Sequence, residues 1–334
     1  MPIAPPPDFA AALAAGPLVL DGGMSNQLAA AGHDLSDELW SARLLADDPE
    51  AVVAAHRAYF AAGADVAITA SYQASFEGFA RRGVRHTDAA RLMASSVELA
   101  REAARAEPGG RRRWVAASVG PYGAVLADGS EYRGRYGLST AELVAFHRPR
   151  LEVLAAARPD VLALETVPDT EEARALLALV RELEVPAWLS YSVAGDRTRA
   201  GQPLAEAFAL AAEVDEVVAV GVNCCTPQDA DRAVALAAEV TGKPVAVYPN
   251  SGEEWDADRR GWRGEPTFRS ARVGGWLADG ARLVGGCCRV GPDGIAALAA
   301  EVAVRRGLMS ERSERTDQRH AWANAPAERS EAGA

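Results

Sequence analysis

The segment DVLALETVPDTEEARALLALVRELEVPAWLSYSV, residues 160–193, decides the fold of this chain. It begins with a short apolar run, DVLALE (160–165), continues with the helical pattern TEEARALLALVRELE (170–184) and ends in a second apolar run, AWLSYSV (187–193). Neither apolar run alternates with polar residues, which indicates strands that are buried on both faces. A buried strand, a helix and a second buried strand are the unit of a parallel sheet with right-handed crossovers.

This strand–helix unit recurs along the chain. Further apolar runs rich in Val, Leu and Ala lie at 17–21, 65–69, 114–119, 216–223, 243–248 and 281–286. Helical patterns occupy segments between the runs, among them 50–63, 90–107 and 229–240. With the two runs of the opening segment there are eight predicted strands. Eight strand–helix units within about 300 residues predict an α/β fold, a (β/α)8 barrel of the TIM type.

A doubly wound open sheet would also account for alternating strands and helices. Two features favour the barrel over this alternative. The number of predicted strands is eight, and no GxGxxG pattern follows the first strand, as it would in a dinucleotide-binding open sheet. We therefore expect a closed barrel.

The barrel is expected to occupy residues 17–308, after a lead-in segment at 1–16. The last helix is predicted over 292–306. The sequence at 309–334 is charged, rich in Ser and Ala and aperiodic, which is typical of a disordered tail.

The composition is that of a soluble globular enzyme, with 49% hydrophobic and 24% charged residues. A formal net charge of −11 disfavours a nucleic-acid-binding surface, which would need a basic stripe to neutralise phosphates. The N-terminal sequence MPIAPPPDFAAALAAG lacks the basic region of a signal peptide, and no window reaches the roughly 18 apolar residues of a membrane span. The sequence thus predicts a cytoplasmic protein without a nucleic-acid or membrane partner.

All four cysteines fall in two adjacent pairs, in GVNCC (221–225) and GGCCRVGP (285–292). Cys224 directly follows the sixth predicted strand, and Cys287 and Cys288 directly follow the eighth. The carboxyl ends of all strands meet at one rim of a barrel, so these three side chains can converge although they are far apart in sequence. The side chain of Cys225 should point away from that of Cys224, which indicates a structural role.

Three cysteine thiolates are a good ligand set for Zn²⁺. A site with three protein ligands keeps a fourth position open, as catalytic zinc sites do, whereas structural zinc sites use CxxC spacings that are absent here. The alternative is that these cysteines fill small apolar gaps at strand ends. Two pairs that both follow strands, each preceded by residues that allow a tight turn, favour zinc over this alternative.

Other polar side chains are expected at the same rim. Glu165 ends a predicted strand after an apolar run, where a carboxylate is unfavourable unless it is paired, for example with a substrate ammonium. Asp21 follows the first strand in the same way, although Asp-Gly-Gly also suits a turn. Asn250 follows the seventh strand and could form hydrogen bonds with a substrate there or stabilise a turn.

Tyrosines in the predicted loops could hold a cationic ligand. These are Tyr72, Tyr122, Tyr132 and Tyr248. Each contact of a cation with an aromatic face stabilises binding by roughly 0.5–2 kcal/mol. The alternative for each tyrosine is packing at the base of its loop.

The motifs at these strand ends resemble the homocysteine S-methyltransferase family of zinc-dependent, thiol-methylating barrels. The resemblance rests on LDGGMSNQL (20–28), AITASYQAS (67–75), SVGPYGAVLADGSEYRG (118–134), FHRPR (146–150), LALET (162–166), GVNC (221–224), VYPNSGE (247–253) and GGCCR (285–289). It covers about residues 17–303, and its motifs follow the order of the predicted strands. The motifs SYQAS, GPYGAxLADGSEYRG and YPNSGE resemble those of the branch that uses S-methylmethionine.

The resemblance implies roles for residues at the rim. The implied zinc ligands are Cys224, Cys287 and Cys288, and the residues implied to hold the amino acid part of homocysteine are Asp21, Gly22 and Glu165. Asn223, Tyr72, Tyr122, Tyr248 and Asn250 complete the predicted substrate-binding set. The implied reaction is Zn²⁺-dependent methyl transfer from a sulfonium donor, S-methylmethionine, to the thiolate of homocysteine. Its partners would be small-molecule substrates.

The sequence leaves three other functions open. Betaine could be the donor, or a selenol the acceptor, on the same barrel. A non-catalytic barrel that binds zinc or thiols is a different class, although neither Glu165 nor a cysteine ligand is missing. A metal-free aldolase would need a Schiff-base lysine at the end of a strand, whereas Lys243 begins one.

Overall fold

The computed structural model describes residues 8–35, 39–256 and 261–323. Its main sheet has eight parallel strands in the order β1-β12-β9-β8-β5-β4-β3-β2, and a bridge between Leu20 and Val66 joins the two outer strands into a ring. The strands are β1 (Leu18–Val19), β2 (Val66–Ile68), β3 (Trp114–Val119), β4 (Val161–Val167), β5 (Ala187–Tyr191), β8 (Val217–Asn223), β9 (Val245–Tyr248) and β12 (Ala281–Val284). The predicted (β/α)8 barrel is confirmed, and the open sheet is excluded by the closing bridge.

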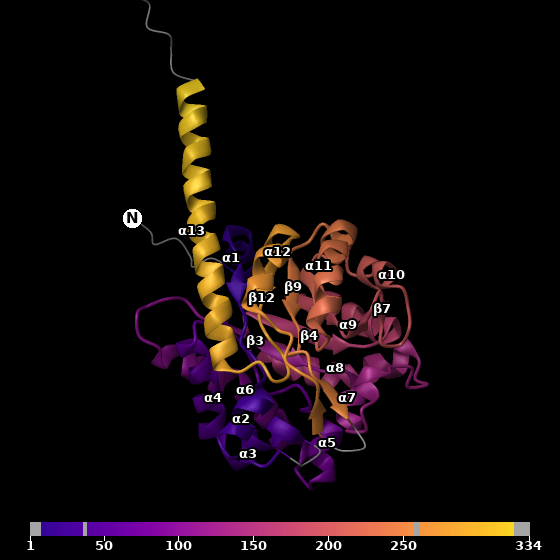
Figure 1. Ribbon diagram of the computed structural model, residues 1–334. Coiled ribbons are helices and arrows are strands. Elements are labelled where there is room, and N and C mark those ends of the chain that lie inside the picture. Colours follow the sequence, from indigo (N-terminus) through magenta and orange to yellow (C-terminus); the bar gives the residue numbers. More distant parts are fainter. Residues whose placement is uncertain (1–7, 36–38, 257–260, 324–334) are drawn as a thin grey trace, which may run out of the picture.

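Helices surround the ring (Figure 1), and several of them begin at residues whose side chains cap the helix. The side chain of Asp169 accepts a hydrogen bond from Glu171 N at the start of α9 (Thr170–Leu183), and Ser139 and Glu142 form a capping box at the start of α8 (Thr140–Ala156). The other helices are α1 (Phe9–Ala15), α2 (Met24–Ala30), α3 (Leu44–Asp47), α4 (Pro49–Ala61), α5 (Phe76–Arg81), α6 (His86–Ala106), α7 (Tyr122–Leu126), α10 (Leu204–Ala209), α11 (Pro227–Thr241), α12 (Val273–Ala278) and α13 (Pro292–Ala323).

The loops of the barrel contain short strands and 3-10 helices. Two hairpins, β6–β7 (Val193–Ala194 and Arg197–Thr198) and β10–β11 (Glu254–Asp256 and Gly261–Arg263), are antiparallel. Three 3-10 helices are η1 (Trp40–Arg43), η2 (Ser130–Tyr132) and η3 (Ser270–Arg272).

Apolar side chains fill the interior of the ring and the layer between the ring and the helices. The ring of Phe9 on α1 packs edge-on against Trp114, with centroids 5.4 Å apart, and stacks on Trp188 at 6.2 Å. α1, which lies in the predicted lead-in at 1–16, therefore packs against the interior side chains of the ring through Phe9. Residues 1–7 lie outside the described part of the chain.

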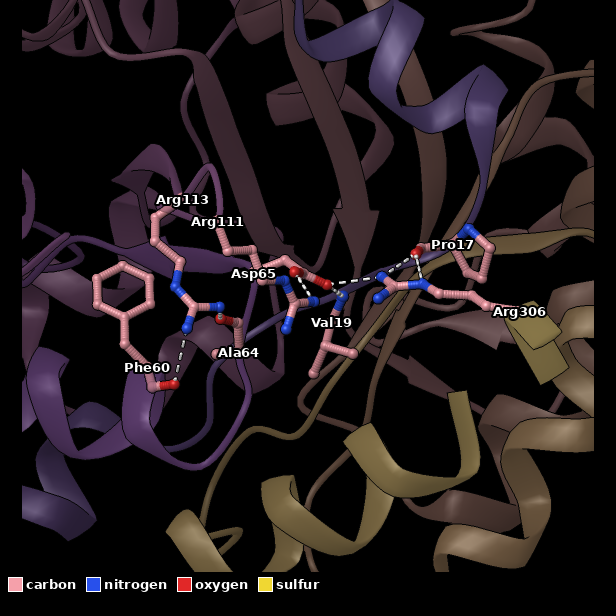
Figure 2. Close-up of polar contacts among 8 residues, drawn as sticks. All are labelled: Pro17, Val19, Phe60, Ala64, Asp65, Arg111, Arg113 and Arg306. Carbon is pink, nitrogen blue, oxygen red and sulfur yellow. Dashed lines mark hydrogen bonds and ion pairs between the residues drawn. The ribbon is translucent and has the colours of Figure 1, made fainter. Parts of the chain in front are cut away.

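Asp65, directly before β2, is the centre of a hydrogen-bonded cluster at the amino-terminal end of the strands (Figure 2). Its Oδ2 accepts hydrogen bonds from Val19 N (3.0 Å) and Arg306 Nη2 (2.7 Å), and its Oδ1 accepts one from Arg111. Arg306 Nε also donates to Pro17 O (3.0 Å). The cluster thus ties α13 to the seam between β1 and β2 where the ring closes.

The last helix is longer than predicted. It was expected over 292–306, but α13 continues through Ala323, and its C-terminal half projects beyond the barrel (Figure 1). Residues 309–323 of the predicted disordered tail are therefore helical. This stretch contains no Gly or Pro and many good helix formers, which outweigh its lack of apolar periodicity.

Residues 324–334 lie outside the described part of the chain, and the division into lead-in, barrel and tail stays a prediction. Within the described ranges, no helix combines the length and the apolar character needed to cross a membrane.

Candidate active site and metal centre

The carboxyl ends of β8 and β12 bring three cysteines together. The Sγ atom of Cys224 lies 2.9 Å from that of Cys287 and 3.8 Å from that of Cys288, and all three sulfurs lie within 4.8 Å of one another. Cys224 is buried, whereas the other two are half-buried. The predicted convergence is thus present, and the cluster is partly exposed at Cys287 and Cys288.

The backbone around the cysteines is held by hydrogen bonds between loops. Cys224 has a φ of +48°, in the left-handed region, so the chain turns sharply as it leaves β8. Cys287 N donates to Pro249 O (2.8 Å), and Cys288 N donates to Asn250 Oδ1 (3.1 Å). The predicted substrate-binding residue Asn250 therefore supports the cysteine loop directly.

The three thiols influence one another's ionisation. Hydrogen bonds with Cys224 and Cys287 hold the pKa of Cys288 well below its usual range, whereas hydrogen bonds with the other two thiols, together with burial, raise the pKa of Cys287. One thiolate is thus favoured in the cluster, and the thiolate is the form that binds metal. Three sulfur donors in a partly exposed cluster fit a thiophilic divalent metal. Cys225 is separate from them and packs in the apolar core.

Two buried carboxylates lie at strand ends of the same rim. Glu165 on β4 is 6% exposed, and its Oε1 accepts a hydrogen bond from Ser118 Oγ. Burial raises the pKa of Glu165 to about 7, and the charge of Cys224 adds to this shift. Asp21, after β1, is 1% exposed; its Oδ2 accepts a hydrogen bond from Ile68 N (2.8 Å), but its Oδ1 has no partner among the described residues.

The environment of Asp21 disfavours its charged form. Burial, and to a smaller extent the charge of Glu165, raise the pKa of Asp21 well above its usual value. Two buried acids that disfavour each other's ionisation are stabilised by a cationic group bound beside them. The rim therefore combines a thiol cluster with a site suited to an ammonium group.

Comparison with known proteins agrees with this arrangement. The sequence model of homocysteine S-methyltransferases matches residues 18–302. The chain belongs to the homocysteine S-methyltransferase family. It is 45% identical over 301 residues to the homocysteine S-methyltransferase YbgG of Bacillus subtilis (strain 168), covering 85% of this chain and 93% of that relative. It is also 45% identical over 292 residues to the homocysteine S-methyltransferase of Escherichia coli (strain K12), covering 85% and 94%.

The structure is similar to a solved structure of the same family. This is the crystal structure of the homocysteine methyltransferase MmuM from Escherichia coli in its metallated form. The TM-score is 0.78 at 43% sequence identity, and the match covers 85% of this chain and 96% of that chain.

In this member of the family, Gly22 and Asn223 shape the rim. A Cβ atom at Gly22 would lie 2.1 Å from Val290 O, so only glycine fits against the loop that follows the cysteines. Asn223 Oδ1 accepts a hydrogen bond from Thr166 N (2.7 Å), and its Nδ2 donates to Thr166 Oγ1 (2.8 Å). Asn223 thus joins the end of β8 to the end of β4. Contact of Gly22 or Asn223 with substrate stays a prediction.

Tyr132 and Tyr248 lie at different depths in the site. The hydroxyl of Tyr132 lies 3.9 Å from Cys224 Sγ, and the residue is 36% exposed. Tyr248 is 1% exposed; its hydroxyl accepts a hydrogen bond from Trp188 Nε1 (2.9 Å) and shares one with Ser190 Oγ (2.6 Å). Tyr132 is therefore placed to meet a ligand at the cysteines, whereas Tyr248 is buried beside Glu165, and its contact with substrate stays a prediction.

The other two predicted tyrosines are also placed differently. Burial, and then the charge of Cys224, raise the pKa of Tyr72 well above its usual value, which indicates a position close to the cysteine cluster. The ring of Tyr122 packs edge-on against Tyr136 (5.2 Å between centroids) and Phe146 (4.9 Å). Tyr122 belongs to an aromatic cluster beside α8, and its contact with substrate stays a prediction.

Sequence reasoning missed two residues of the rim, Ser118 and Glu131. Ser118 lies inside the apolar run of β3, where a small polar residue gives no signal of its own. Glu131 is 9% exposed, and its Oε2 has no partner among the described residues. Burial raises the pKa of Glu131 to about 7, and the charge of Cys224 adds to this. The sequence feature that could have pointed to Glu131 was its position directly before Tyr132 in the loop motif at 118–134.

Proposed function

We propose that this protein transfers a methyl group from a sulfonium donor, S-methylmethionine, to the thiol of L-homocysteine, with Zn²⁺ as cofactor and methionine as product. One observation carries the proposal: three thiols gather within 4.8 Å at the same rim as the buried carboxylates of Asp21 and Glu165. A centre that binds a thiol, combined with a site for an ammonium group, suits an amino acid thiol such as homocysteine.

Cys224, Cys287 and Cys288 would hold the zinc. The fit is favourable because three sulfur donors are close together and partly exposed at Cys287 and Cys288. When bound, zinc keeps a substrate thiol in its thiolate form at neutral pH, so that no general base is needed. Reduced thiols at the site are consistent with the predicted location in the cytoplasm.

The buried carboxylates would bind the ammonium group of homocysteine. Asp21 Oδ1 lacks a partner among the described residues and is therefore available as an acceptor. Ser118 holds Glu165 in place through its hydrogen bond to Oε1. An ammonium group between the two acids would favour their ionised forms and offset the desolvation that disfavours them.

The methyl transfer is a direct displacement. A bond forms between the homocysteine sulfur and the methyl carbon while the bond from that carbon to the donor sulfonium breaks. The electron pair of the broken bond stays on the donor sulfur, which leaves as the neutral thioether of methionine. The protein's task is to hold the three atoms in line, with the homocysteine sulfur about 3–3.5 Å from the methyl carbon. Tyr132 lies beside Cys224, and its ring, which carries the guanidinium of Arg199 5.8 Å from its centroid, would offer its other face to the cationic donor.

The relatives support this proposal. YbgG and the Escherichia coli protein are named homocysteine S-methyltransferases, and MmuM was crystallised in a metallated form. The sequence motifs that resemble the S-methylmethionine-using branch support the choice of donor.

The test measures methionine formation from homocysteine with S-methylmethionine, betaine or S-adenosylmethionine as donor, together with the zinc content of freshly reduced protein. We expect about one zinc per chain and turnover of S-methylmethionine that is lost on chelation and restored by added zinc. Bound zinc without turnover of any donor would leave a zinc-binding barrel and overturn the reaction. Protein that is active while free of zinc would overturn the cofactor.

A further inference from the structure

Glu131 is a buried carboxylate of the rim that has no role in the reaction as described so far. It lies on η2, in the loop between α7 and α8, directly before Tyr132, whose hydroxyl lies 3.9 Å from Cys224 Sγ. It is 9% exposed, and its Oε2 has no hydrogen-bond partner among the described residues. A buried ionised carboxylate is unfavourable unless a cation accompanies it.

The charged groups around Glu131 do not supply this cation. Asp128 and Cys224 would carry charges of the same sign as Glu131. Arg133 partly offsets them, but its side chain is 67% exposed and lies 3.6 Å from Asp128. Among the described residues, no basic side chain forms an ion pair with Glu131. The carboxylate thus has no ion-pair partner among the described residues, and Arg133 offsets its charge only in part.

The position of Glu131 is set by the fold of its loop. Gly129 adopts a φ of +79°, and Ser130 N donates to Asp128 Oδ1 (2.9 Å). A Cβ atom at Gly123 would lie 2.4 Å from Glu131 N, so the loop packs directly on α7. The unpartnered oxygen is therefore held in a defined place.

We infer that Glu131 binds the methyl donor by pairing with its sulfonium charge. The inference rests on the proposed function and adds the residue that recognises the donor. Asp21 and Glu165 at strand ends already provide for the ammonium group of homocysteine. Glu131 instead adjoins the contact of Tyr132 with Cys224, and the donor must bring its methyl group and its positive charge to a sulfur held at the cysteines.

The donor loses its positive charge during the reaction, and this loss determines which kinetic constants a substitution of Glu131 should change. The sulfonium is positive in the bound donor and becomes a neutral thioether as the methyl group leaves. Glu131 therefore stabilises the bound donor more than the transition state, and an interaction of this kind lowers KM without raising kcat. A residue that only shaped the loop would act on kcat and on stability instead.

The experiment compares Glu131→Gln with the wild type on the zinc-loaded protein. We expect the KM for S-methylmethionine to rise about 30-fold or more, the KM for homocysteine to stay within about twofold and kcat not to fall. Calorimetric titration with S-methylmethionine in the absence of homocysteine should show binding weakened by a similar factor. Glu131→Asp, which keeps the charge, should lie between the two.

Asp128→Asn is the matched control, since it removes one acidic charge from the same loop at a side chain that is 54% exposed, while the amide oxygen of Asn can still accept the hydrogen bond from Ser130 N. It should leave the KM for the donor within about twofold, because exposed charges are screened. An unchanged donor KM in Glu131→Gln, or a rise confined to homocysteine, overturns the inference alone. So does a lower kcat accompanied by a lower Tm. A wild-type protein that uses no sulfonium donor overturns the proposed function and the inference together, and this is decided before any variant is measured.

Discussion

Asp65 at the amino-terminal end of the barrel and Asp21 at the carboxyl end are both buried, with 3% and 1% of their surface exposed. Both oxygens of Asp65 accept hydrogen bonds within the protein, from Val19, Arg306 and Arg111 (Figure 2). Asp21 uses one oxygen for Ile68 N and leaves the other without a partner among the described residues. The carboxylate at the base is fully paired within the fold, whereas the carboxylate at the rim keeps one oxygen available to a ligand.

This difference assigns separate tasks to the two ends of the strands. Burial raises the pKa of Asp21, Glu165 and Glu131 at the rim, so the fold holds these acids in an unfavourable environment. At the base, ion pairs join helix and strand where the ring closes. Substitutions at the base should therefore affect stability, and substitutions at the rim should affect binding and catalysis.

The largest effect is expected from the cysteine cluster. Cys287→Ser should abolish zinc retention and reduce turnover on the order of 10⁴-fold or more, because a serine hydroxyl is not ionised at neutral pH. Zinc is measured per chain beside the rate of methionine formation. Cys225→Ala is the control: its side chain packs in the core, so it should keep the zinc and lose about 1 kcal/mol of stability. Full zinc content and normal turnover in Cys287→Ser would show that the cluster is not the metal site.

The next effect separates the two ends directly. Asp65→Asn should reduce the free energy of unfolding by about 1–3 kcal/mol, because it removes the anion that pairs with Arg111 and Arg306, whose side chains are 43% and 34% exposed and can still be hydrated. Asp21→Asn should change it by less than about 1 kcal/mol and raise the KM for homocysteine by about 10-fold or more. Urea unfolding of the metal-free proteins and steady-state kinetics test the pair. Equal losses of stability in both variants would remove the distinction between base and rim.

The sequence was sufficient for those parts of the molecule that depend on where strands begin and end. The apolar run at 160–165 does not alternate, so its burial on both faces could be predicted, and β4 is buried along its whole length. The cysteines could be predicted to meet because the ends of all strands share one rim. Neither inference needed the conformation of any loop.

The sequence was not sufficient to predict the environment of a side chain where that environment depends on the conformation of a loop or of a strand end. Glu131 is buried because its loop packs on Gly123, a contact that spacing alone does not reveal. Thr166, with a φ of +60°, turns so that its backbone N–H and its hydroxyl meet the amide of Asn223, a pair of hydrogen bonds that the sequence does not reveal. The helical continuation of α13 lacks the apolar periodicity on which the prediction relied.

A smaller effect should appear in the pH dependence of stability. The pKa of Glu165 is about 7 in the folded protein against an ordinary value of 4.5, so between these pH values the folded state binds more protons than the unfolded state. The contribution of Glu165 to stability is therefore full below about pH 4.5 and declines as the pH rises towards 7, by at most about 3 kcal/mol. Glu165→Gln should remove this decline. Unfolding of metal-free, reduced wild type and variant is measured across this range, and parallel curves would contradict the assignment.

The smallest effect on activity is expected from removing the hydroxyl of a partly exposed tyrosine, Tyr132, in comparison with that of a buried one, Tyr248. Tyr132→Phe deletes the contact with Cys224 Sγ at a residue that is 36% exposed, so stability should stay within about 0.5 kcal/mol while kcat/KM falls about 3- to 10-fold. Tyr248→Phe deletes a buried hydroxyl and leaves Trp188 Nε1 without its acceptor, so stability should fall by about 1–3 kcal/mol. Kinetics and thermal unfolding of both variants are compared. A side chain at the rim that is available to a ligand makes few interactions within the protein, so removing its hydroxyl should cost little stability. A loss of stability in Tyr132→Phe as large as that in Tyr248→Phe would therefore show that Tyr132 has a structural role.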